Sequence, residues 1–158
     1  MLTKTKKKNN IEIYELPRIL IKEIFYFYLR DKVIDYNYHI NDKSLEREKR
    51  SYRNALTKIF FYLKKFIKID LIVGFNAFYM AEIELRKAAL NNSLKFLVLH
   101  KENIYSPIEN SILKFMYSKL NKKFDGTKLL VYSENEKNLF LKAKLVDKKK
   151  ISVVGIPR

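Results

Sequence analysis

The densest group of side chains that could do chemistry is the run His100, Lys101 and Glu102. A neutral imidazole can accept a proton near pH 7, and a carboxylate beside a lysine can act as a base or orient a hydroxyl group. The ammonium group of Lys101 could hold a phosphate or a sugar oxygen. An ordinary charged surface loop contains the same residue types, so both interpretations stay open at this point.

Three further polar residues stand directly after other apolar runs. Asn76 can hydrogen-bond a sugar hydroxyl or cap the helix that follows it. Ser133 and Glu136 have the spacing of a capping box, which predicts Ser133 as a helix N-cap. The free N–H groups at such a helix start could also bind an anion. Glu134 would lie at the mouth of the same site or simply favour the helix dipole.

Short apolar runs alternate with helical patterns from residue 70 onward. The expected strands are 71–73, 96–99, 129–131 and 151–154, and the expected helices are 78–90, 107–120 and 134–144. Continuous apolar strands separated by helices predict an α/β fold, with a Rossmann-like parallel sheet of about five strands and helices on both faces. The carboxyl ends of parallel strands share one edge, where ligands bind. We therefore expect the polar residues above to converge there.

The first half of the chain is less informative. Residues 1–10 are basic and predict a flexible tail, and residues 11–158 then form a single domain. Within it we expect a strand at 11–14, a helix at 17–30, a loop at 31–42 and a long helix at 45–67 with Ser44 as its N-cap. The apolar stripe of the long helix faces a core or, as the alternative, a membrane surface.

Composition limits the function classes. The 158 residues contain no Cys and two His, which excludes cysteine chemistry and makes a histidine metal cluster improbable, so no metal site is expected. Lys and Arg exceed Asp and Glu by 33 to 17, a formal charge of +16. The excess favours anionic partners such as nucleic acid or phospholipid. However, 26 of the 33 basic residues are Lys, and the codon bias of an AT-rich genome would also produce such an excess.

Targeting and nucleotide-binding motifs are missing from the sequence. Glu12 and Glu15 interrupt the basic N-terminus where a signal peptide would be apolar, and the longest uncharged stretch, 71–81, is too short for a spanning helix. These features predict a cytoplasmic protein. The prediction leaves room for peripheral contact with the inner membrane. Three scattered Gly residues form neither a dinucleotide-binding loop nor a P-loop.

The C-terminal third resembles a known arrangement. Residues 128–136 read as a strand followed by a helix that begins Ser-Glu, and residues 151–158 read as a strand that ends in Gly-x-Pro-Arg. This pattern resembles the end of the N-terminal domain of GT-B glycosyltransferases. The run 96–102 followed by Ser106-Pro107 is similar to the bacterial surface-carbohydrate and capsule-biosynthesis members of that family. The resemblance covers residues 70–158 best.

The resemblance implies an acceptor-side domain that helps transfer a sugar from a nucleotide-sugar to a surface polysaccharide or lipopolysaccharide. His100 or Glu102 would be the base that deprotonates the acceptor hydroxyl, and Lys101 and Asn76 would contact the acceptor. Ser133, Glu134 and Arg158 would lie near the interdomain cleft. The expected partners are a sugar or lipid-linked acceptor, a C-terminal donor domain or partner chain, and the inner membrane surface.

The chain departs from the family where the donor domain should begin, after Arg158. We therefore expect this domain to bind no cofactor alone, and the nucleotide-sugar to bind in the complete enzyme. A basic nucleic-acid-binding module is the alternative, because Tyr and Phe mixed with Lys could stack on bases, although no helix-turn-helix or RNP-like motif is present. A non-catalytic domain that binds a partner protein is the third hypothesis.

Overall fold

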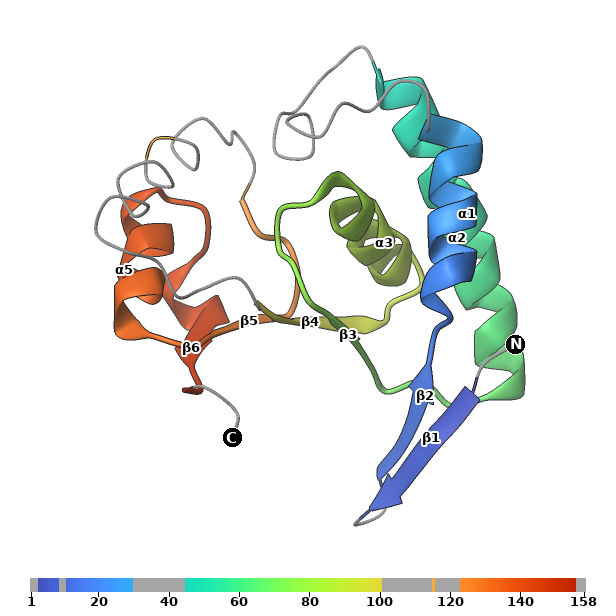
Figure 1. Cartoon of the computed structure of the whole chain (residues 1–158), viewed down its shortest axis with the longest axis horizontal. Helices are drawn as coiled ribbons and strands as arrows, with labels where there is room; N and C mark the ends of the chain where they lie inside the picture. The colour runs from blue at the N-terminus through green and yellow to red at the C-terminus, as the bar shows by residue number, and fades with distance from the viewer. Residues whose placement is uncertain (1–2, 9–10, 30–44, 101–114, 116–122, 156–158) are drawn as a thin grey trace.

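A computed structural model of the chain describes residues 3–8, 11–29, 45–100, 115 and 123–155. Its central element is a sheet of four parallel strands in the order β3-β4-β5-β6 (Figure 1). The strands are β3 (Leu71–Gly74), β4 (Lys95–Leu99), β5 (Lys128–Val131) and β6 (Ile151–Val153). The predicted α/β class with a Rossmann-like parallel sheet is therefore confirmed.

Two helices connect neighbouring strands of this sheet. Helix α3 (Met80–Asn91) lies between β3 and β4, and α5 (Glu134–Lys142) with the short 3-10 helix η4 (Lys148–Lys150) lies between β5 and β6. Right-handed connections that step in one direction across a sheet place their helices on one face. Figure 1 shows α3 and α5 on the same side of the sheet.

Burial along the strands follows this one-sided cover. In β4 and β5 the side chains that face the helices are buried, and those that alternate with them remain partly exposed. The buried set is Phe96, Val98, Leu129 and Val131, and the partly exposed set is Leu97, Leu99 and Leu130. The described helices thus cover one face of the sheet. A second layer on the other face, expected from the uninterrupted apolar runs, is not among the residues described.

Helices α1 (Arg18–Leu29) and α2 (Glu46–Phe66) add a further layer beside α3 (Figure 1). The apolar stripe of α2 is buried at Tyr52, Leu56 and Phe60, and the ring of Tyr52 meets that of Phe25 edge to face at 5.4 Å. The stripe therefore faces the core rather than a membrane. Helix α2 has Leu45 at its N-cap position, whereas Ser44 and the predicted loop lie outside the described residues.

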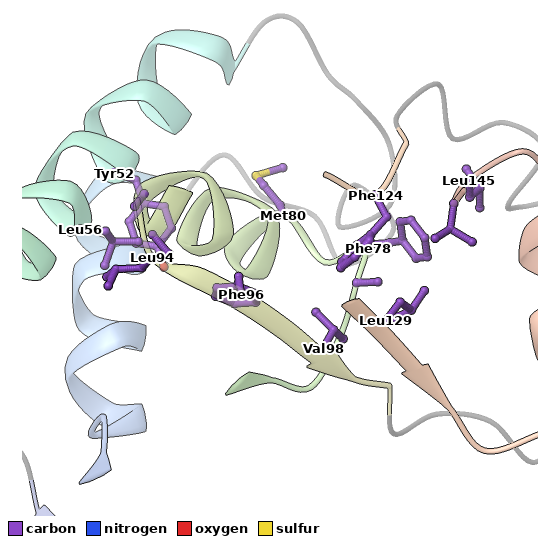
Figure 2. Packing of buried hydrophobic residues seen from close by; sticks show 14 of the residues in the cluster. Tyr52, Leu56, Phe78, Met80, Leu94, Phe96, Val98, Phe124, Leu129 and Leu145 are labelled. Atoms are coloured by element: carbon purple, nitrogen blue, oxygen red, sulfur yellow. The ribbon is translucent and has the colours of Figure 1, made fainter. Parts of the chain in front are cut away.

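The core is continuous from α2 across α3 to α5. Figure 2 shows Tyr52 and Leu56 at one end of it, Phe96 and Val98 in the middle, and Leu145 at the other end. A buried ion pair crosses the helical layer, because Glu84 of α3 lies 3.0 Å from Arg53 of α2 and 2.8 Å from Lys87. Glu84 is 1% exposed, so these cations compensate a charge that water does not reach.

The N-terminus corrects one prediction. Residues 3–8 form strand β1 (Thr3–Lys8), which pairs antiparallel with β2 (Ile11–Glu15) instead of forming part of a flexible tail. The register places Lys7 opposite Glu12 and Lys8 opposite Ile11. A lysine-rich run has low intrinsic β propensity, so pairing with β2 is what explains its extended conformation.

The helix expected at 107–120 lies outside the described residues except at Phe115, which is helical and 61% exposed. In the part of the chain that is described, no helix is both long enough and apolar enough to cross a bilayer.

Candidate functional site

A buried histidine–glutamate pair joins the ends of two neighbouring strands. His100 follows β4 directly, and its Nδ1 lies 3.0 Å from Oε1 of Glu136, in the first turn of α5. His100 is 1% exposed and Glu136 3%. The pair sits at the carboxyl edge of the parallel sheet, where α/β proteins of this kind bind their ligands.

Local backbone structure places both partners. The N–H of His100 donates to the carbonyl of Leu130 at 2.9 Å, which continues the β4–β5 ladder one residue beyond β4. Ser133 is the N-cap of α5, because its Oγ accepts a hydrogen bond from the N–H of Glu136 at 3.2 Å. The predicted Ser133 cap is therefore confirmed, and it sets Glu136 at the first turn of the helix facing His100.

The carboxylate of Glu136 departs from the expected capping box. In that motif it would accept from the backbone N–H of the cap residue itself. Here Oε2 accepts from the N–H of Tyr132 at 3.3 Å, while Oε1 is held by His100. The histidine at the end of β4 thus turns a helix-capping glutamate into a link between two strand ends.

The protonation state of Glu136 determines how the His100–Glu136 pair is hydrogen-bonded. Burial raises the pKa of Glu136, and the hydrogen bonds from His100 and from the Tyr132 backbone counteract part of that rise. Above the raised pKa the carboxylate can only accept, so Nδ1 of His100 carries the hydrogen and Nε2 is the basic nitrogen. Glu136 therefore fixes the orientation of the imidazole ring and its tautomer.

Two aromatic rings enclose the imidazole. Phe140, one turn after Glu136 on α5, meets it edge to face with the ring centroids 5.4 Å apart. Phe78, which precedes α3, lies 6.3 Å away. Because Phe78 also contacts Phe140 at 5.4 Å, the three rings form one cluster under the edge of the sheet. The imidazole is consequently held rigidly by packing as well as by its hydrogen bond.

Asn76 lies at the same edge, and its side-chain oxygen is engaged in the turn that precedes α3. Its Oδ1 accepts from the backbone N–H groups of Phe78 at 2.8 Å and Tyr79 at 2.9 Å, just before α3 begins. It is 4% exposed. The N-cap position of α3 is Tyr79, so Asn76 does not cap the helix itself; its side chain closes the turn that leads into α3 and holds Phe78 there.

Glu134 lies apart from the buried pair. Its side chain is 64% exposed and forms an ion pair with Lys137 at 3.0 Å. Both Glu134 and Glu136 are in the first turn of α5, where negative charge favours the helix dipole. Only the second of them faces inward.

Glu82 is a carboxylate at this edge that the sequence did not single out. A Cβ atom at Gly74, the last residue of β3, would lie 2.5 Å from Oε2 of Glu82 and 2.9 Å from the Phe96 ring. Glycine at the end of β3 therefore makes room for the carboxylate of α3. Gly74 was the available signal in the sequence, because a glycine at the end of a strand can mark a close approach. The sequence alone does not show that Glu82 is the side chain that fills the space.

The predicted residues divide into two groups. Asn76, His100 and Ser133 come together at the carboxyl edge, and Glu134 lies beside them on the outside of α5. Lys101, Glu102 and Arg158 lie outside the described residues. Within the described ranges, no three His, Asp or Glu side chains come together as metal ligands.

Comparisons with protein-family models, with curated proteins and with solved structures found no match. The functional argument therefore depends on the geometry of this edge and on the sequence pattern that leads into it.

Proposed function

We propose that the chain is the acceptor-side domain of a GT-B-like glycosyltransferase that builds a surface polysaccharide or lipopolysaccharide. The carboxyl edge of its sheet receives the acceptor, which is a sugar or a lipid-linked sugar. A donor-binding domain or a partner chain supplies the nucleotide-sugar. The reaction takes place on the cytoplasmic side of the inner membrane.

The end of the chain supports this proposal. Strand β5, helix α5 with its Ser133 cap, and strand β6 follow one another as the glycosyltransferase resemblance implies. Gly155, the glycine of the Gly-x-Pro-Arg pattern, has a φ of +72°, a conformation that glycine adopts without strain. This glycine stands at the point where the family resemblance places the passage into a second domain.

The observation that carries the proposal is the His100–Glu136 pair at this edge. Its imidazole is almost fully buried, so we assign it a positioning role: it fixes the point from which Lys101 and Glu102 continue. Glu102 is then the proposed base, and Lys101 a contact to the acceptor. The side-chain oxygen of Asn76 already accepts from the N–H groups of Phe78 and Tyr79, so a donation to the acceptor comes from its amide nitrogen.

The proposed step is a single group transfer. Glu102 accepts the proton of the acceptor hydroxyl, and the acceptor oxygen forms a bond to the anomeric carbon of the donor sugar. The bond from that carbon to the nucleotide diphosphate breaks, and the diphosphate leaves with the electron pair. We assign Ser133, Glu134 and Arg158 to the contact with the donor side, as the family resemblance implies.

Binding to the full chain tests this assignment. Amide NMR spectra would be recorded with bacterial surface oligosaccharides and, separately, with UDP-glucose. We expect an acceptor oligosaccharide to shift the amide signals of Asn76, His100 and Ser133, and UDP-glucose to leave them unchanged at millimolar concentration. UDP-glucose binding at micromolar concentration, or no shift with any saccharide, would contradict an acceptor-side domain.

Activity in the presence of the donor-binding domain tests the base. Glu102→Gln removes the proton acceptor and should abolish transfer while the thermal unfolding of the protein stays unchanged. Asp70→Asn is the matched control, because Asp70 is exposed at the opposite end of β3 and pairs only loosely with Lys68 at 3.8 Å. Full activity of Glu102→Gln would remove Glu102 from the mechanism.

A further inference from the structure

The outer face of α2 is a basic stripe that the proposed function does not use. Positions 47, 50, 54, 58, 61 and 65 recur at helical spacing, opposite the buried stripe, and all six are exposed. Four of them are cations and none is an acid. We call this set the α2 basic face; its members are Arg47, Arg50, Asn54, Lys58, Phe61 and Lys65.

Within the described ranges, Arg47, Arg50, Lys58 and Lys65 form no ion pair, whereas the nearby acids are already engaged. Glu46 lies 3.9 Å from Lys49 and 3.8 Å from Arg53, neither of which belongs to the α2 basic face. The positive charge of the face is therefore uncompensated over a helix of 21 residues, about 31 Å long. Such a surface attracts an extended anionic partner.

Exposed aromatic rings gather at the C-terminal end of the same helix. Phe61 is 52% exposed, Tyr62 56% and Phe66 81%, and Lys64, Lys65 and Lys68 alternate with them. Large apolar rings beside lysines are typical of helices that lie at a lipid–water interface: the rings enter the headgroup region, and the lysines reach the phosphates.

The ring geometry favours a lipid surface over nucleic acid. The Nζ atom of Lys65 lies 4.6 Å from the centre of the Phe61 ring and 5.3 Å from that of Tyr62. The ammonium group thus occupies ring faces on which a base would stack. An ammonium group over an aromatic ring suits a headgroup layer, where the cation contacts phosphate and the ring contacts acyl chains.

From these observations we propose that the α2 basic face docks the protein on a bilayer of anionic phospholipid. This inference does not depend on the sugar-transfer proposal, because it rests on charge and aromatic exposure away from the carboxyl edge of the sheet. The helix lies along the membrane surface, with Phe61, Tyr62 and Phe66 inserted at one end. The buried stripe of α2 stays packed against α1 and α3.

Vesicle co-sedimentation of the full chain tests the proposal. Vesicles of phosphatidylcholine alone would be compared with vesicles containing 30% phosphatidylglycerol, at low and at high salt. We expect binding to the anionic vesicles that weakens at least about tenfold when salt screens the charges. Equal binding to both vesicle types, or binding to neither, would overturn the proposal.

Two variants with the same change of charge locate the surface. The first replaces the four cations of the α2 basic face by Gln and should weaken vesicle binding at least about tenfold. The control replaces four exposed lysines elsewhere by Gln and should retain most of the binding; its sites are Lys95, Lys142, Lys148 and Lys149. Equal losses in both variants would show that only net charge matters.

A third variant, Phe61→Ser with Phe66→Ser, should remove the part of the binding that survives high salt, because that part comes from ring insertion. A 20-nucleotide single strand serves as the competing probe. If the chain bound this oligonucleotide but not the anionic vesicles, and the α2 substitutions abolished that binding, the face would be a nucleic-acid surface and the membrane proposal would be wrong. Circular dichroism of each variant confirms that it is folded.

Discussion

Nδ1 of His100 and Oε1 of Glu136 lie 3.0 Å apart, although 36 residues separate them in the sequence. This hydrogen bond fastens the end of β4 to the first turn of α5, and it leaves neither group in contact with bulk water. The integrity of the carboxyl edge should therefore depend on Glu136 more than on any acid exposed around it.

Replacing Glu136 by Ala should lower the free energy of unfolding by about 2–3 kcal/mol, because it leaves a buried imidazole and the N–H of Tyr132 without their acceptor. Glu136→Gln, which keeps an acceptor oxygen, should cost less. Urea denaturation measures both. Glu134→Ala is the matched control, and its loss should stay within about 0.5 kcal/mol since that side chain is 64% exposed. Equal losses at the two positions would contradict the buried pair.

The free energy of unfolding should depend on pH in the direction expected for a carboxyl group whose pKa is raised in the folded state. Burial raises the pKa of Glu136 in the folded chain above its ordinary value, so the folded state binds the proton more tightly than the unfolded state. The stabilisation from this group is fully present below the ordinary pKa and is lost as the pH rises through the raised pKa. Carboxyl carbon NMR should give a titration midpoint for Glu136 above that of the exposed Glu134; a midpoint at or below that of Glu134 would refute the prediction.

Tyr52 should tolerate loss of its hydroxyl group. Its side chain is fully buried, and within the described part of the chain its Oη atom has no hydrogen-bond partner. Burial, with Glu82 and Glu84 nearby, raises the pKa of this phenol above its usual range. Tyr52→Phe should therefore change the free energy of unfolding by less than about 1 kcal/mol or increase it.

Tyr52→Ala supplies the contrast, because the ring fills the space between α1, α2 and α3. A cavity of that size should cost about 3–5 kcal/mol. Thermal denaturation of the two variants separates the hydroxyl from the ring. If Tyr52→Phe were as damaging as Tyr52→Ala, the hydroxyl would have a partner that matters for stability.

Gly74→Ala should be more harmful than Gly155→Ala. The added Cβ at position 74 would meet the Phe96 ring at 2.9 Å, inside the core, as well as the carboxylate of Glu82. Overpacking of this kind typically costs about 1–3 kcal/mol. Among the described residues, no atom lies within 4 Å of a Cβ added at Gly155, so the expected cost is the backbone strain at a φ of +72°, about 1 kcal/mol. The reverse order of stability would disprove the close packing at the end of β3.

Much of the fold could be predicted from the sequence, because its signals are local. The four strands of the parallel sheet and helices α1, α2, α3 and α5 lie within about two residues of the predicted bounds. Apolar runs and helical spacing are properties of the chain itself. Strand β1 was missed because its conformation depends on pairing with β2, which its own lysines do not reveal.

The position of three predicted residues at the carboxyl edge could be predicted from the sequence, but their side-chain contacts could not. The convergence of Asn76, His100 and Ser133 follows from the parallel sheet, and the capping spacing marked Glu136 as part of a helix start. The spacing could not reveal that Glu136 turns towards His100, because that choice depends on a neighbour 36 residues away. The position of the described helices on one face follows from the order of the strands that they connect, which the apolar runs alone do not contain.

The strand order also bears on how the protein is made. Each strand from β4 to β6 pairs with the strand that was synthesised just before it, so the sheet can grow at one border as the chain leaves the ribosome. No later segment has to insert between two finished strands. The carboxyl edge, by contrast, is completed only when Glu136 emerges and reaches back to His100. Strands β4 and β5 can thus pair before the hydrogen bond between His100 and Glu136 forms at the carboxyl edge.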